Sequence, residues 1–451
     1  MDKEHNHFEE GEFLTDLGQP KKIAEIRGIL RKILGEGTCQ KLALALMNDR
    51  CLPEALPAKT IEEAVPQLAE RYPGTPLNLL NVRGLKSGIT GLKDNLLPGK
   101  KTICRILYAM KANSQAAILQ TMREAGIGGF DCASSNEADT ALMQGAPAED
   151  IYYNFPKHSP QELTSVLQKG VRYVTVDTAE ALAGAIKAAR DLPDAENLRI
   201  AVRIAVKNPD AAMPMEEKFG IPSDENGRIR EMLKTIRNSG GRPGICVHVG
   251  SQTQDPEIYR KAIETVAALA REAGGVNHIN LGGGLPVDYF GVIPHPPEDF
   301  FREINEAVET HISDDVLTGD NQKILFEFGR FLIAPHVHWI SPIRSMEIKD
   351  GLPYLNYAGG IHNTLNGLKV HGWPMPPADV IAPDGAKRQG KKITCVLSGE
   401  SCNPADMLQA EIPSDTAVGD YLKLANAGAY TDSYGSHFNG FTLPLYALYN
   451  T

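Results

Sequence analysis

The sequence predicts an α/β protein that consists of an N-terminal helical extension, a (β/α)8 barrel and a C-terminal, mostly antiparallel, β-sandwich-like domain. From about residue 100, eight short β-branched or aromatic runs alternate with helical patterns over roughly 230 residues. After about residue 335 the helical periodicity fades, and strand-like runs alternate with turns rich in Pro and Gly. A chain of 451 residues is long enough for both domains.

The barrel is expected to alternate strands with helices along the chain. The strands are expected near residues 103–108, 127–130, 151–154, 173–176, 199–204, 245–249, 278–281 and 324–327. The helices are expected near residues 113–125, 134–144, 159–169, 178–191, 226–238, 256–273 and 297–312. A doubly wound open sheet would show the same alternation. However, no Gly-x-Gly-x-x-Gly motif follows the first strand, and eight repeats are more than that fold usually needs.

The N-terminal extension has three helical patterns. Apolar residues between 23 and 34 fall on one helical face, and Gly35 is expected to end this helix. Further helical stretches run over residues 41–47 and 61–71. We expect this extension to pack on the main body of the protein as a docking or lid segment.

The composition indicates a cytoplasmic protein that binds neither nucleic acid nor membranes. A net charge of -10 and a pI near 5.7 argue against a surface for nucleic acid or anionic lipid. The sequence has no apolar run of the ~20 residues that span a bilayer, and its polar N-terminus is not a signal peptide. Its seven cysteines are scattered and lack a Cys-x-x-Cys pair, which favours reduced thiols over a disulfide framework or a metal site.

Reactive side chains follow the expected C-terminal ends of the barrel strands, which is where barrel enzymes hold their active sites. Lys111 follows the first strand, and Asp131 ends the second. His248 ends the sixth strand, Gly282–Gly284 follow the seventh, and Glu327–Arg330 end the eighth. One polar residue at a strand end is ordinary, but reactive, charged or glycine residues at five strand ends predict a functional site.

Some of these residues suit an anionic ligand. Gly282–Gly284 would let backbone N–H groups approach an anion, and a helix is expected soon after them. Ser251 and the turn at Gly329–Arg330 would add further donors to the same group. The sequence therefore indicates a phosphate cradle.

The remaining residues suit an aldehyde on a basic aromatic ring. Lys111 would form an imine with the aldehyde, Glu327 would pair with a protonated ring nitrogen, and His248 would stack against the flat ring. An aldehyde, a phosphate and a basic ring nitrogen together describe pyridoxal 5′-phosphate, PLP.

Several of these features also have structural explanations. Three glycines in a row are more often a loop than a phosphate cradle. Ser134 and Glu137 match a capping box that opens a helix, and Asp177 matches a helix N-cap. His248, taken alone, is more often a core histidine of an apolar strand than a ligand-stacking residue. The functional interpretation therefore depends on the combination of residues.

The chain resembles the fold-type III PLP-dependent decarboxylases, the group that includes ornithine, diaminopimelate and arginine decarboxylases. The matching segments occur in the family's order from about residue 75 to the C-terminus, and only residues 1–75 fall outside. The segments are YAMKAN (108–113), GFDCASSNEAD (129–139), HVGSQ (248–252), NLGGG (280–284), EFGR (327–330), GESCNPADML (399–408), NAGAY (426–430) and HFNGF (437–441).

This resemblance implies a domain arrangement and an assembly. It implies an extension over residues 1–75, a strand and linker over 76–95 that join the β-domain, a PLP-binding barrel over 96–335 and a β-domain over 336–451. It also implies a head-to-tail homodimer with shared active sites, in which the loop that carries Cys402 reaches the PLP of the partner.

The resemblance also implies residue roles. Lys111 would hold PLP as an imine, Glu327 would keep the ring nitrogen protonated, and His248 would stack on the ring face. Cys402 would protonate the carbon left after CO2 departs. Further positions implied to contact PLP are Asp131 and Glu137 near the ring edge, Arg203 near the ring oxygen, and Ser251, Gly283, Gly284, Gly329, Arg330 and Tyr430 at the phosphate.

The chain departs from the family pattern at two positions. Phe328 replaces the Pro of the usual Glu-Pro-Gly-Arg motif, which changes the backbone of that loop. Asn403 stands where ornithine and diaminopimelate decarboxylases usually carry an acid directly after the Cys. Asn403, Asp406 and Tyr434 are therefore the candidates for contact with the distal amine of a substrate.

The resemblance also bears on the substrate. Diaminopimelate decarboxylases carry an Arg-Pro pair in the first loop of the β-domain, and residues 360–367 contain no Arg. The other motifs resemble the diaminopimelate branch, which removes a carboxyl from a D-configured carbon. We therefore hypothesise decarboxylation of D-ornithine or D-lysine to a diamine. The alternatives are an L-ornithine, L-lysine or diaminopimelate decarboxylase, a fold-type III racemase, and a non-catalytic homologue.

Overall fold

The computed structural model describes residues 49–451 apart from 101–102, 191, 193 and 214–216. The helical patterns expected at 23–34 and 41–47 lie outside the described residues. The third expected helix is α4 (Ile61–Arg71), where the Thr60 side chain accepts a hydrogen bond from the Glu63 N–H and so caps the N-terminus. No helix in the described part of the chain is long and apolar enough to cross a membrane.

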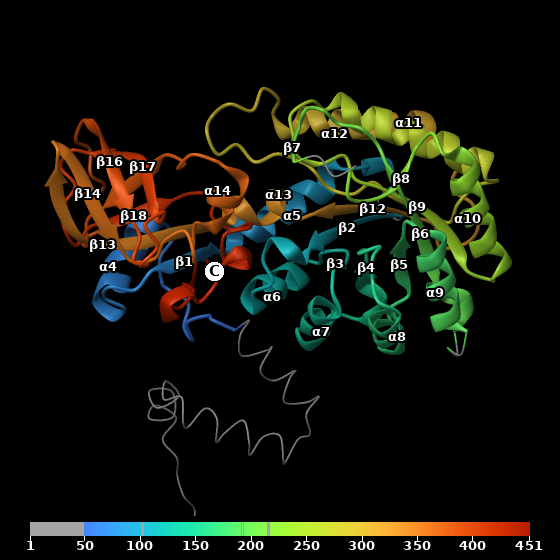
Figure 1. Cartoon of the computed structure of the whole chain (residues 1–451), viewed down its shortest axis with the longest axis horizontal. Helices are drawn as coiled ribbons and strands as arrows, with labels where there is room; N and C mark the ends of the chain where they lie inside the picture. The colour runs from blue at the N-terminus through green and yellow to red at the C-terminus, as the bar shows by residue number, and fades with distance from the viewer. Residues whose placement is uncertain (1–48, 101–102, 191, 193, 214–216) are drawn as a thin grey trace, which may run out of the picture. The chain divides into compact units, whose positions relative to one another are not determined.

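The eight expected strands form a closed parallel barrel (Figure 1). They are β2 (Cys104–Ala109), β3 (Phe130–Cys132), β4 (Ile151–Tyr153), β5 (Tyr173–Val176), β6 (Arg199–Ala205), β9 (Arg242–Val247), β11 (His278–Asn280) and β12 (Lys323–Phe328). Their order around the barrel is β5-β4-β3-β2-β12-β11-β9-β6, and pairing of β5 with β6 closes the ring. A short strand, β8 (Ile221–Pro222), is added beside β6.

Helices lie between the strands and cover the outside of the barrel, with α11 and α12 on one side and α6 to α9 on the other in Figure 1. They are α6 (Ala116–Glu124), α7 (Ser135–Met143), α8 (Pro160–Gln168), α9 (Ala179–Ala189), α10 (Asn226–Asn238), α11 (Glu257–Glu272) and α12 (Pro297–His311). Ser134 caps α7 as expected, because its side chain accepts a hydrogen bond from the Glu137 N–H, although the Glu137 carboxylate bonds the Ala133 N–H instead of completing a capping box. The cap of α9 is Thr178, whose side chain accepts from the Ala181 N–H, and not the expected Asp177.

The barrel strands separate two apolar regions. Their outward side chains join the inner faces of the helices in one large buried cluster, to which α11 contributes Ile263 and Val266. Inside the barrel, Leu107, Tyr152, Tyr173 and Leu325 form a separate buried cluster. The barrel is therefore filled by side chains at mid-height, and ligands can enter only at its ends.

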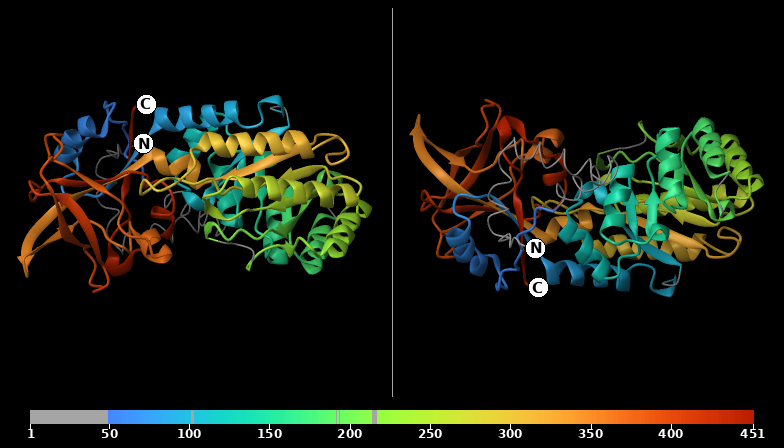
Figure 2. Two further views of the ribbon diagram at one scale, coloured as in Figure 1. Left: turned by 90° about the horizontal axis from the view of Figure 1, so that it is seen from above. Right: turned by 90° about the horizontal axis from the view of Figure 1, so that it is seen from below.

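The C-terminal domain is a mostly antiparallel sheet, as the sequence predicts. Its strands are β13 (Val337–Lys349), β14 (Leu352–Tyr357), β15 (Ala378–Ile381), β16 (Lys392–Ser398), β17 (Met407–Pro413), β18 (Tyr421–Leu424) and β19 (Leu445–Tyr449). The order is β15-β18-β13-β14-β16-β17, and the β14–β16 pair is parallel. Both views in Figure 2 show this domain beside the barrel, with β13 leading from one to the other.

The segment before the barrel belongs partly to this sheet. Strand β1 (Leu77–Asn81) pairs antiparallel with β13 and parallel with β19. The linker expected after it is a helix, α5 (Val82–Asn95), which is capped by the Asn81 side chain. Gly88 lets α5 approach the 3-10 turn η5 (Ala334–His336) closely, because a Cβ there would lie 2.8 Å from the Nε2 atom of His336. The chain therefore contributes a strand to the β-domain before it forms the barrel.

Candidate active site

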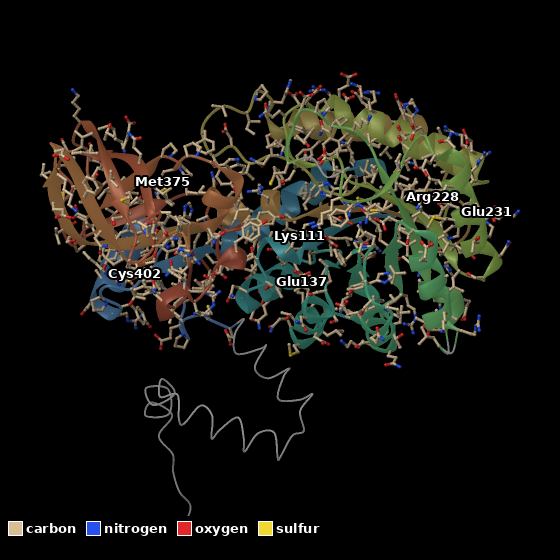
Figure 3. All side chains as sticks on the ribbon, viewed as in Figure 1. Lys111, Glu137, Arg228, Glu231, Met375 and Cys402 are labelled. Carbon is tan, nitrogen blue, oxygen red and sulfur yellow. The ribbon has the colours of Figure 1, made fainter. Side chains whose placement is uncertain are left out.

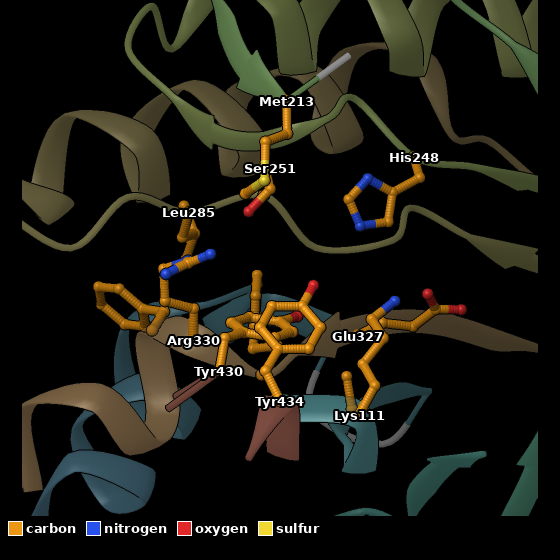
Figure 4. A pocket seen from close by; sticks show the side chains of 14 residues that line it. Lys111, Met213, His248, Ser251, Leu285, Glu327, Arg330, Tyr430 and Tyr434 are labelled. Carbon is orange, nitrogen blue, oxygen red and sulfur yellow. The ribbon is translucent and has the colours of Figure 1, made fainter. Parts of the chain in front are cut away.

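A cavity of about 270 Å³ lies at the C-terminal ends of the barrel strands (Figure 4). Its lining includes residues from the barrel and, through Tyr430 and Tyr434, from the β-domain. Expected site residues that line it are Lys111, His248, Ser251, Gly284, Glu327, Gly329, Arg330, Tyr430 and Tyr434. The lining residues that the sequence did not indicate include Met213, Leu285 and Phe331.

Lys111 lies in a single 3-10 turn, Met110–Ala112, directly after β2. Burial alone would lower the pKa of its ammonium group, but the nearby charges of Asp131, Tyr430 and Glu327 raise the pKa above its ordinary value. The side chain points into the cavity from below, toward Glu327 and His248 (Figure 4). A lysine held at a strand end among carboxylates is placed to react with an aldehyde once it loses its proton.

The turn that carries Lys111 is attached to the β-domain. The side chain of Asn113 donates to the Gly428 carbonyl at 3.0 Å and to the Tyr446 hydroxyl at 2.7 Å. The Tyr430 N–H donates to the Ala112 carbonyl at 3.0 Å. Asn113 was not singled out from the sequence, although it lies inside a family motif. These bonds make the Lys111 turn and the loop with Tyr430 one structural unit.

Glu327 presents one of its two oxygens to the cavity. Its Oε1 accepts hydrogen bonds from the side-chain amides of Asn280 and of Asn154, the latter at 2.8 Å. Burial first, and then the Asp131 carboxylate, raise the pKa of Glu327. Because both amides bond the same oxygen, Oε2 is left to face a donor in the cavity. A protonated ring nitrogen would supply that donor and a compensating positive charge.

His248 is a neutral ring. Burial first, and then the charges of Lys111 and Arg203, hold its pKa well below the ordinary value. Its Nδ1 accepts a hydrogen bond from the Gly250 N–H at 3.1 Å, so the ring proton lies on Nε2. The imidazole faces the cavity from the side opposite Lys111 (Figure 4). It can therefore pack on a flat ligand without adding charge.

The glycine run after β11 follows a backbone path that side chains would block. A Cβ at Gly283 would lie 2.2 Å from the Glu327 carbonyl oxygen. Gly284 has a φ of +112°, and a Cβ there would lie 2.4 Å from the Gly250 carbonyl oxygen. Gly284 and Ser251 both line the cavity, so backbone and hydroxyl donors lie close to any anion bound there.

Arg330 carries the clearest sign of an anion site. Its buried guanidinium group lies 4.6 Å from the centre of the Tyr430 ring and 5.3 Å from that of Trp373. Nη1 donates to the Tyr289 hydroxyl at 3.2 Å. Nε and Nη2 are buried and have no hydrogen-bond partner among the described residues. A phosphate group in the cavity would satisfy both donors, so these residues fit the cofactor that the sequence predicts.

Four expected residues lie near this cavity but are not among its lining residues. Asp131 and Arg203 are buried, and their charges act on Lys111. Glu137 accepts a hydrogen bond from the Ala133 N–H at 2.6 Å, and burial raises its pKa to about 7. Gly283, likewise, contributes through its backbone position. The three charged groups set the electrostatic environment of Lys111.

The loop that carries Cys402 does not line this cavity in the single chain. Figure 3 places Cys402 on the β-domain, apart from Lys111. Cys402 is exposed, and its N–H donates to the Asn439 side chain at 2.9 Å. Asp406 is buried, and its carboxylate accepts hydrogen bonds from the Ile361 N–H at 2.8 Å and the Ser401 hydroxyl at 2.6 Å. In this chain the Asp406 carboxylate is therefore occupied in holding the loop.

Comparisons with known proteins agree with this geometry. Residues 94–334 match the model of the pyridoxal-dependent decarboxylase family, pyridoxal binding domain. The match covers more than half of the chain, so the protein belongs to the family of fold-type III PLP-dependent decarboxylases. PLP is accordingly its cofactor.

The similarity extends beyond the barrel. The chain is 28% identical to an ornithine decarboxylase of Caenorhabditis elegans over 358 residues, which are 75% of this chain and 80% of that protein. It is 28% identical to a diaminopimelate decarboxylase of Methanothermobacter thermautotrophicus over 406 residues, which are 85% and 88%. A crystal structure of a lysine/ornithine decarboxylase from Vibrio vulnificus, complexed with cadaverine, shares the fold with a TM-score of 0.74 at 24% identity and covers 89% of this chain and 99% of that one.

Proposed function

We propose that this enzyme removes the α-carboxyl group of a basic diamino acid, with D-ornithine or D-lysine favoured, and releases CO2 and a diamine. The observation that carries the proposal is the convergence of Lys111, Glu327 and Arg330 on one cavity (Figure 4). There an aldehyde, a ring nitrogen and a phosphate would each meet a suitable partner. Relatives named as ornithine and diaminopimelate decarboxylases support the class of substrate.

The protein residues prepare the cavity for this reaction. When bound, PLP supplies the electron sink for the pair left behind as CO2 departs. Asn154 and Asn280 fix Oε1 of Glu327, so Oε2 would be free to keep a proton on the ring nitrogen. A positive ring near Glu327 would favour the ionised carboxylate and so would offset the effect of burial on the pKa of Glu327. Neutral His248 would pack on the ring without competing for that proton.

The site is completed, on this proposal, by a second copy of the chain in a head-to-tail homodimer. Cys402 is exposed and lies outside its own chain's cavity, as a residue offered to a partner must be. Asn439 and Asp406 hold the Cys402 loop in one shape. The thiol of the partner then returns a proton to the carbon that has lost CO2.

The contacts proposed for the substrate are neutral. Asn403 bonds the Ala405 N–H through Oδ1 at 2.9 Å and approaches the His362 Nε2 atom through Nδ2 at 2.8 Å. Its Oδ1 keeps a second lone pair for a distal amine. Tyr434 lines the cavity with 39% of its surface exposed and offers a hydroxyl. The bonds of Asp406 within its loop favour a supporting role there, while direct contact with the amine stays a prediction from the sequence.

The test is to incubate the PLP-loaded enzyme with D- and L-ornithine, D- and L-lysine, L-arginine and meso-diaminopimelate, and to measure evolved CO2 and the diamine. We expect CO2 from D-ornithine or D-lysine. The matched control is Lys111→Ala, which keeps the cavity but removes the imine and its visible absorbance. Release from the L-isomers alone would exclude the D-preference, and release from none of these substrates would exclude the proposed function.

The same assays test the two other classes of protein. A racemase would change the optical rotation of the amino acid without releasing CO2. A non-catalytic homologue would lack the visible absorbance of a PLP imine. The segment that carries Cys402 argues against a racemase, and the presence of both Lys111 and Cys402 argues against a non-catalytic homologue.

A further inference from the structure

Arg330 lines two cavities of different size. One is the active-site cavity of about 270 Å³, and the other is a smaller pocket of about 40 Å³, to which the β-domain contributes Trp339 and Trp373. Trp373 lines the smaller pocket and is not among the lining residues of the active-site cavity. An effect of Trp373 on a ligand in the active-site cavity must therefore pass through a residue that reaches both, as Arg330 does.

The charge of Arg330 is held by aromatic rings. Arg330 begins α13 (Arg330–Ile333), and among the described residues the hydrogen-bond partner of its guanidinium group is the Tyr289 hydroxyl and not a carboxylate. The centre of this group lies 4.6 Å from the ring centre of Tyr430, 5.3 Å from that of Trp373 and 5.8 Å from that of Tyr289. An aromatic face attracts a cation without neutralising it, so the charge stays available to a phosphate group.

The three rings differ in what else they do. Tyr430 lines the active-site cavity, so it can contact a ligand there directly. Tyr289 accepts a hydrogen bond from Nη1 of Arg330 through its hydroxyl. Trp373 does neither, and its indole is the kind of ring that attracts a cation most strongly. Its contact with Arg330 is therefore one between a ring and a cation, made from the side of the smaller pocket.

The backbone of the β-domain fixes the position of Trp373. Its N–H donates to the Leu368 carbonyl at 2.8 Å, which closes a turn after the helix α14 (Asn366–His371). Three of the four residues that follow Trp373 are prolines, whose rings fix the backbone angle φ. The segment that carries the indole therefore has few conformations open to it.

A loop of the barrel holds the indole from the other side. The side chain of Asp288 folds this loop, because its Oδ1 accepts hydrogen bonds from the N–H groups of residues 290–292 at 2.7 to 3.2 Å. The loop presents Tyr289 and Phe290, whose ring centres lie 5.5 Å and 6.3 Å from that of Trp373. The indole is thus packed between the β-domain and the barrel, next to Arg330.

The indole limits the space into which Arg330 can move. At about 40 Å³ the smaller pocket holds no more than a few water molecules, so the guanidinium group has little room on that side. Loss of the indole would add its volume to this pocket. The guanidinium group could then turn away from the phosphate, and ordering it again on binding would lower the affinity for the cofactor.

We propose that Trp373 is a positioning residue of the phosphate site. It holds the guanidinium group of Arg330 in place, so that the unpaired Nε and Nη2 donors meet the phosphate of PLP. Through this ring the β-domain raises the affinity of the barrel for its cofactor. The role concerns cofactor binding and is the same whichever amino acid the enzyme decarboxylates.

The experiment titrates the cofactor-free, full-length enzyme with PLP and with pyridoxal, which has the same ring and aldehyde but no phosphate, and follows the visible absorbance of the imine. We expect Trp373→Leu to raise the dissociation constant of PLP by roughly fivefold to thirtyfold. The dissociation constant of pyridoxal should stay the same. The matched control is Tyr354→Leu, which removes a β-domain ring that lies 5.0 Å from Nζ of Lys349 and should change neither affinity.

A second comparison uses the Arg330→Met variant. With no guanidinium group to hold, adding Trp373→Leu should cause no further loss of PLP affinity. If Trp373→Leu does not fold, Trp373→Phe, which keeps a smaller ring, must weaken PLP severalfold and leave pyridoxal unchanged. The proposal is overturned if the Trp373 variant that folds binds PLP as the wild type does. It is also overturned if that variant loses affinity for PLP and pyridoxal equally, because the indole would then support the whole cavity and not the phosphate site.

Discussion

Replacing Arg330 with Met separates cofactor binding from the stability of the empty enzyme. In the cofactor-free chain the guanidinium group is buried, and its Nε and Nη2 donors lack partners among the described residues. Met keeps the length of the side chain and its contact with Tyr430 and Trp373 but removes the charge and the donors. We therefore expect weaker PLP binding without a loss of stability in the cofactor-free protein.

The magnitudes follow from the contacts of Arg330. Two charge-assisted hydrogen bonds to phosphate are worth about 1.5–3 kcal/mol each. Their loss predicts a dissociation constant for PLP that rises by a factor on the order of 100 or more. In the cofactor-free protein, leaving the two donors unsatisfied costs about 1–3 kcal/mol each, whereas the contacts with Tyr430, Trp373 and Tyr289 return about 0.5–1 kcal/mol each. Arg330→Met removes both the cost of the unsatisfied donors and the gain from the cation–ring contacts. The free energy of unfolding of the cofactor-free protein should therefore stay unchanged or rise by up to a few kcal/mol.

The assay measures PLP binding by the visible absorbance of the imine, and stability by urea unfolding of the cofactor-free protein. Arg230→Met is the matched control, because Arg230 forms an ion pair with Glu272 in which both side chains are exposed, on α10 and α11. The control should change neither the PLP affinity nor, beyond about 1 kcal/mol, the stability. An Arg330→Met variant with wild-type PLP affinity, or with a large loss of stability in the cofactor-free form, would refute the assignment of Arg330 as the phosphate ligand.

Three further predictions follow from the same structure. Gly283→Ala should abolish PLP binding in the absorbance assay, because the new Cβ would lie 2.2 Å from the Glu327 carbonyl oxygen. Its control is Gly91→Ala in α5, where the new Cβ meets open space. This control should raise the free energy of unfolding in urea by about 0.5–1 kcal/mol. Cys402→Ala should still release CO2 but give less diamine per CO2, and an unchanged ratio would exclude the thiol as proton donor. Burial first, and then the charge of Arg199, lower the pKa of His278 to about 3 in the folded protein. As the pH falls below about 6.5, this histidine is therefore protonated in the unfolded chain but stays neutral in the folded one. Stability should therefore fall by up to about 1.4 kcal/mol per pH unit through this residue, and His278→Gln should flatten the slope between pH 6 and 4 by about one proton.

Much of the fold was predictable because periodicity reports burial. All eight barrel strands were expected within a few residues, since strands covered on both faces read as apolar runs. The helix α5 was missed because Gly84, Gly88 and Gly91 lower its helix propensity. Gly88 is explained only by the structure, where the His336 ring leaves no room for a side chain. Packing between distant segments outweighed local propensity.

The site was predictable where chemistry follows a strand. Lys111, His248 and Glu327 fall at strand ends, so the barrel brings them to one cavity. Trp373 was missed because its role depends on contact with Arg330, which lies 43 residues earlier in the chain. The roles of Asn154 and Asn280 depend likewise on contact with Glu327. No local pattern marks a side chain whose function is to orient another.

The β-domain bears on two active sites at once in the proposed dimer. It places Tyr430 in the cavity of its own chain, at a φ of +59° that few residues other than Gly adopt. That conformation is held because the Tyr430 N–H bonds the Ala112 carbonyl, next to Lys111, and because Asn113 bonds the Gly428 carbonyl. The same domain presents Cys402 to the partner. A change at Asn113 is therefore expected to disturb the Tyr430 loop, and with it cofactor binding, in its own chain.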